Sequence, residues 1–125
     1  MSVQDVAVRA SFPNEIISDA GWHRLAQRAT ELLTEEVRDS GVVIPALHAD
    51  WSVQAGTAAT PVFELRLSDI PNDPQPVLAR IPIDRMQHDD SLRQDTHRLW
   101  RQLLRHRSKR QAESIGVFIK GQAGE

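Results

Sequence analysis

The sequence predicts one α+β domain in which two amphipathic helices pack on one face of an antiparallel sheet. Short segments of alternating apolar and polar residues indicate strands, and two longer segments with apolar residues three and four apart indicate helices. Sequential strands joined by short loops usually pair antiparallel. The expected order is β-α-β-β-β-α-β. We assign residues 1–120 to this single domain and residues 121–125 to a flexible C-terminal tail.

The first strand and the first helix are expected near the start of the chain. Residues 6–12 alternate Val, Ala and Phe with Arg and Ser, which is typical of a strand with one solvated face. Residues 19–40 follow as a helix that Ser18 or Asp19 can cap and that Gly41 can end. The apolar stripe of this helix contains Trp22, Leu25, Ala26, Ala29, Leu32, Leu33 and Val37.

Three strands are expected in the middle of the chain. Residues 51–55, 62–68 and 77–83 each alternate apolar with polar side chains. The segment 69–76 holds three prolines and is therefore predicted to be a loop. Pro82 lacks a backbone N–H, so the last of these strands is expected at a sheet edge or to end there.

A second helix is predicted at about 90–108, with Ser91 and Gln94 as a capping box. The run Ile-Gly-Val-Phe-Ile at 115–119 is expected to form a last strand. The core is then expected to combine side chains of both helices and the middle strands, namely Leu25, Leu32, Phe63, Leu65, Ile81, Leu99 and Leu103.

The composition limits the class of protein. The chain has 125 residues and no cysteine, which excludes disulfides and cysteine-bound zinc. The sequence shows neither a secretory signal nor a long apolar segment, so we expect a cytoplasmic protein without membrane association. Residues 1–92 carry 7 Lys or Arg against 14 Asp or Glu, whereas residues 93–125 carry 8 against 3. An acidic body with a basic C-terminal quarter favours an acidic partner for that quarter.

The basic second helix is the main candidate for a functional surface. Arg98, Arg101 and Arg105 are three and four residues apart, so they share one helical face. Guanidinium groups bind carboxylates and phosphates in a bidentate way, which predicts an acidic protein or a nucleic acid as partner. Cations near the end of a helix also complement its dipole, which is the structural alternative. The predicted partner-binding residues are Arg98, Arg101, Arg105, Arg107, Lys109 and Arg110.

Metal binding and catalysis find little support in the sequence. Histidine and carboxylate side chains gather near the start of the second helix, but their spacing matches no established ligand motif. We therefore expect no metal, no cofactor and no catalytic residue. The side chains concerned are His88, Asp89, Asp90, Asp95 and His97. In the proline loop, Asp69, Asn72 and Asp73 are expected to form Asx turns rather than a calcium site.

These observations predict a small non-enzymatic binding or accessory protein. The helix–strand–strand–strand–helix order of its middle resembles the topology of double-stranded-RNA-binding domains, which implies a nucleic-acid-binding module. That family begins its second helix with lysines, whereas this chain has Asp89-Asp90-Ser91 there. The same order and slight acidity resemble type III secretion chaperones, which implies a homodimer. A small enzyme using histidine and carboxylate groups is the third alternative.

Overall fold

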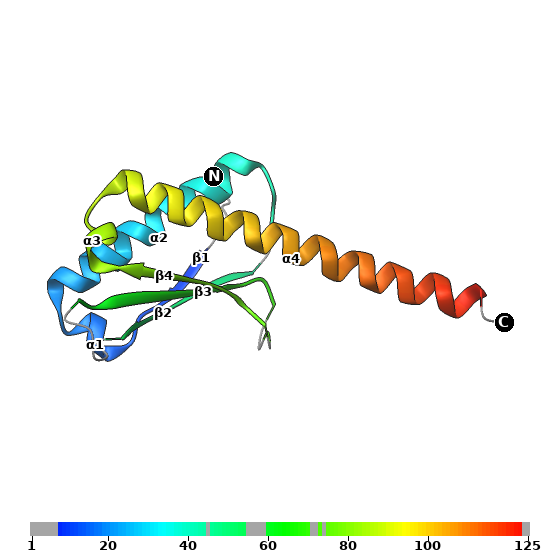
Figure 1. Ribbon diagram of the computed structural model, residues 1–125, viewed down its shortest axis with the longest axis horizontal. Helices are drawn as coiled ribbons and strands as arrows, with labels where there is room; N and C mark the ends of the chain where they lie inside the picture. The colour runs from blue at the N-terminus through cyan, green and yellow to red at the C-terminus, as the bar shows by residue number, and fades with distance from the viewer. Residues whose placement is uncertain (1–7, 45, 55–59, 71–72, 74, 124–125) are drawn as a thin grey trace, which may run out of the picture.

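The structure of the chain is a computed structural model that describes residues 8–44, 46–54, 60–70, 73 and 75–123, the last ten as backbone only. The chain is an α+β protein with a four-stranded mixed sheet and helices, shown in Figure 1. In chain order the elements are β1 (Val8–Ser11), α1 (Asn14–Ile17), α2 (Ala20–Ser40), β2 (Leu47–Gln54), β3 (Val62–Ser68), β4 (Val77–Pro82), α3 (Ile83–Met86) and α4 (Asp89–Ala123).

The sheet follows the chain order β1-β2-β3-β4. Strands β2, β3 and β4 form the expected antiparallel meander, in which Trp51 pairs with Leu65. The prediction of a wholly antiparallel sheet is wrong, because β1 runs parallel to β2 with Val8 opposite Leu47. A parallel pair needs a long crossover, and the connection through α2 provides one. The rule for short loops therefore does not apply to this pair.

Helices α2 and α4 lie side by side over the same side of the sheet (Figure 1). The buried Trp51 of β2 donates from its indole nitrogen to the hydroxyl of Thr30 in α2, at 3.0 Å. Trp100 and Leu99 of α4 are buried in the same core. Of the seven residues predicted to pack together, six belong to this core and Leu25 is partly buried against it.

Both ends of α2 lie where the sequence predicts them. The carboxylate of Asp19 accepts a hydrogen bond from the backbone N–H of Trp22 at 3.1 Å. Gly41 then ends the helix with a φ of 74°, a left-handed conformation that favours glycine. These local signals fixed both helix boundaries because they depend only on neighbouring residues.

Helix α4 begins at Asp89, so Ser91 lies inside its first turn and is not the N-cap that the sequence suggested. Asp89 instead accepts a hydrogen bond from the guanidinium of Arg28 in α2, at 2.7 Å. That hydrogen bond holds the pKa of Asp89 below its ordinary value. The contact ties the start of α4 to the middle of α2.

The predicted strand at 115–119 is wrong, because these residues continue α4 as far as Ala123. No proline or glycine interrupts residues 105–115, so extending an existing helix costs less than starting a separate element. Figure 1 shows the C-terminal part of α4 running beyond the sheet. No helix in the described part of the chain has the length and apolarity to span a membrane. The domain limits at 1–120 stay a prediction.

Candidate functional site

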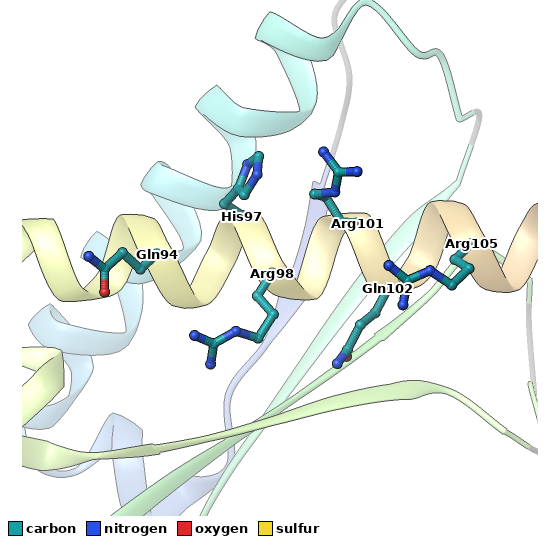
Figure 2. A pocket seen from close by; sticks show the side chains of 6 residues that line it. All are labelled: Gln94, His97, Arg98, Arg101, Gln102 and Arg105. Atoms are coloured by element: carbon teal, nitrogen blue, oxygen red, sulfur yellow. The ribbon is translucent and has the colours of Figure 1, made fainter.

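The solvent-facing side of α4 carries three arginines that we call the arginine face: Arg98, Arg101 and Arg105. They lie away from the buried stripe of the helix, which consists of Leu92, Leu99, Trp100 and Leu103. Figure 2 shows their side chains projecting outward from one stretch of α4. All three are exposed, and the Arg98 side chain is 70% exposed. The helix supplies a rigid support for these cations.

Two shallow hollows adjoin on this surface. The first has a volume of about 400 Å³, and Gln94, His97 and Gln102 line it together with the arginine face (Figure 2). The second has a volume of about 380 Å³, and it is lined by Arg101, Leu104, Arg105 and Ser108. Arg101 and Arg105 border both hollows. A ligand seated here would therefore meet two guanidinium groups and several neutral hydrogen-bonding groups at once.

The arginine face has little internal neutralisation. Arg98 comes no closer than 3.7 Å to the carboxylate of Asp95. That carboxylate already accepts two hydrogen bonds from Arg85, at 2.9 and 3.1 Å, and these raise the pKa of Arg85. Among the residues that the structure describes, no ion pair involves Arg101 or Arg105. Their charges remain available to a partner.

The other predicted cations have a different environment. Arg107 and Arg110 both bind one oxygen of Asp69, at 2.9 and 2.6 Å, and the Asp69 side chain is only 4% exposed. Lys109 is exposed and borders a separate hollow beside the loop that follows β3, together with Glu113. The structure thus divides the six predicted residues into three on the arginine face, two bound to Asp69, and Lys109.

The histidine and carboxylate side chains near the start of α4 do not converge. His97 contacts Glu36 of α2 at 2.9 Å, while Asp95 binds Arg85 and Asp89 binds Arg28. Within the described ranges, no three His, Asp or Glu side chains are placed to hold a metal ion. Asp89, Asp95 and His97 instead join α4 to α2 and α3.

One of the Asx turns expected in the proline loop is present. The carboxylate of Asp73 accepts a hydrogen bond from the backbone N–H of Gln75 at 2.9 Å, which is an Asx turn. Asn72 lies outside the described residues. Asp69 has the structural role already described, in binding two arginines of α4.

Some residues at this surface were not anticipated from the sequence. Gln94 and Gln102 flank Arg98 at one helical turn on either side, so the four-residue spacing could have indicated them. Arg85 could not have been found this way, because it lies in α3, outside the repeat of α4.

Comparison with known proteins finds no matching family model, no similar curated protein and no similar solved structure.

Proposed function

We propose that this chain is a non-enzymatic binding or accessory protein that holds an acidic protein partner through the arginine face. The observation that carries this proposal is the position of Arg101 and Arg105. Both are exposed, both border two adjoining hollows, and neither forms an ion pair within the described structure. A guanidinium fixed on a rigid helix binds a carboxylate with two parallel hydrogen bonds and loses little freedom in doing so.

A nucleic-acid-binding module is the main alternative, since guanidinium groups also bind phosphates. The surroundings of the arginine face favour a protein. Asp90 is exposed at the start of the same helix, and Arg28 is shared between Asp89 and Glu31, so these three carboxylates keep a net negative charge. A long polyanion that followed α4 would meet these carboxylates. A short acidic protein segment would avoid them.

The proposal is tested by reversing the charge of the two unpaired arginines. We expect Arg101→Glu with Arg105→Glu to weaken the binding of a fluorescently labelled glutamate-rich peptide by about tenfold or more, because each lost charge-assisted contact is worth about 1.5–3 kcal/mol. Binding is measured by fluorescence anisotropy, and circular dichroism checks the fold.

The matched control is Arg24→Glu with Arg38→Glu, which changes the net charge equally on exposed positions of α2. This control should bind the peptide like the unmodified protein. Equal binding by the Arg101/Arg105 variant would contradict the proposal. Preferential binding of a labelled RNA duplex, with a steep loss of affinity as salt rises, would support the nucleic-acid alternative instead.

A further inference from the structure

A groove runs between β4 and α4, next to the arginine face. Four consecutive strand residues, Leu78 to Ile81, line one side of it, and its volume is about 200 Å³. Successive residues of a strand point to opposite faces of the sheet, so a groove that contacts all four lies along the strand's outer edge. Its other wall is the flank of α4 formed by Asp95, Arg98, Leu99 and Gln102.

The backbone of β4 has hydrogen-bonding groups directed at this groove. β4 is the last strand of the sheet and pairs with β3 on one side. The N–H of Ile83 donates to the carbonyl of Pro61 at 3.1 Å, which fixes the alternation of the antiparallel ladder. Ile81 and Ala79 therefore bond to β3, whereas the N–H and C=O groups of Leu78 and Arg80 point away from β3.

We propose that an extended acidic segment of a partner protein adds to β4 as a further strand and lies in this groove. This inference rests on the proposed function and specifies the partner's conformation. Side chains on the helix side of the added strand would meet Arg98 and Gln102. Those on the opposite side would meet Leu78, which is 39% exposed, and Arg80, whose side chain is 66% exposed.

The charges of the groove indicate an acidic segment. Asp95 is the carboxylate on its helix wall, and Arg85 and Arg98 already contact that carboxylate. Arg80 shares Glu64 with Arg66, so two cations contact a single buried carboxylate. A second copy of β4 is disfavoured as the added strand, because its own Arg80 would be brought to this cationic edge and like charges on neighbouring strands repel.

The probe is a synthetic acetylated peptide of four Glu-Val repeats, whose glutamates can face α4 while its valines face Leu78. On binding, we expect hydrogen exchange at the Leu78 and Arg80 amides to slow by about tenfold or more, because they gain hydrogen-bond partners. The amides of Ala79 and Ile81 already bond to β3 and should change little. Exchange is followed residue by residue by NMR.

Two variants separate backbone pairing from side-chain contact. Leu78→Pro removes the N–H that points into the groove and leaves the bonds to β3 in place, so it should weaken peptide binding about tenfold. Leu78→Ala keeps that N–H and should bind nearly as well as the unmodified chain. Of two peptides N-methylated at alternate amides, one at its valines and the other at its glutamates, only one should fail to bind, because only one edge of the added strand faces β4. A Lys-Val peptide should bind weakly.

The outcomes distinguish this inference from the proposed function. If Arg101→Glu with Arg105→Glu weakens peptide binding while Leu78→Pro and N-methylation do not, the strand-addition model is overturned and the proposed function stands. If the arginine replacements, Leu78→Pro and N-methylation all leave peptide binding unchanged, both the strand-addition model and the proposed function are overturned. If the Leu78 and Arg80 amides are already protected in a protein that sediments as a dimer, a second copy occupies the edge and the inference is wrong.

Discussion

Asp69 determines which cations of α4 are left for a partner. Its carboxylate follows β3 directly and is almost fully buried, and one of its oxygens accepts a hydrogen bond from Arg110 and forms an ion pair with Arg107. Two guanidinium groups held this close depend on the negative charge between them. Asp69 also fastens the loop after β3 to the part of α4 that leaves the sheet.

Replacing that charge should destabilise the fold. We expect Asp69→Asn to lower the free energy of unfolding by about 2 kcal/mol, because it weakens the charge-assisted hydrogen bond from Arg110, removes the ion pair with Arg107 and leaves the two arginines to repel each other. Urea denaturation measures the change. Asp50→Asn is the matched control, since Asp50 is exposed on β2 and its loss should cost less than about 0.5 kcal/mol. Equal denaturation curves for the two variants would show that Asp69 contributes nothing to stability.

Helix α4 depends on its buried stripe for its position on the sheet. Leu99 is 1% exposed and packs in the core shared with α2 and the strands. We expect Leu99→Ala to cost about 2–5 kcal/mol, since it removes buried methyl groups and leaves a cavity. Leu104→Ala on the same helix is the control, because Leu104 is only partly buried and should cost less. Thermal unfolding that ranks the two variants in the opposite order would contradict this placement of α4.

Elements with strong local signals were predictable from the sequence. The strand at 62–68 was predicted with the bounds that the structure shows, and Pro82 correctly indicated the end of an edge strand. The parallel pairing of β1 was not predictable, because it depends on where α2 returns the chain. The run at 115–119 was also ambiguous, since five apolar-rich residues fit a strand or a helix equally well.

The candidate site was predictable only in part. The spacing of Arg98, Arg101 and Arg105 placed them on one face without any tertiary information. The pairing of Arg107 and Arg110 required knowledge of Asp69, which is distant in sequence and lies in a loop of irregular conformation. The groove beside β4 depends on two elements meeting, so no sequence pattern revealed it.

At the scale of the whole molecule, many basic side chains of the C-terminal quarter form ion pairs with acidic side chains of the N-terminal body. Acidic side chains of α2 bind the first turns of α4, where Arg93 contacts Glu35 at 3.4 Å and His97 contacts Glu36 at 2.9 Å. Asp69 binds two more cations farther along the helix. Among the described Arg and Lys side chains of α4, Arg101, Arg105 and Lys109 form no ion pair, and two of these three belong to the arginine face.

The length of α4 has a consequence for how the protein behaves in solution. A helix of 35 residues is about 50 Å long, whereas a compact domain of 125 residues has a radius of gyration of about 14 Å. We expect small-angle X-ray scattering to give a clearly larger radius for the monomer. A value near 14 Å would mean that the end of α4 folds back onto the sheet. An elongated monomer also elutes early from a sizing column, so early elution alone would not indicate a dimer, and the mass must be measured by light scattering.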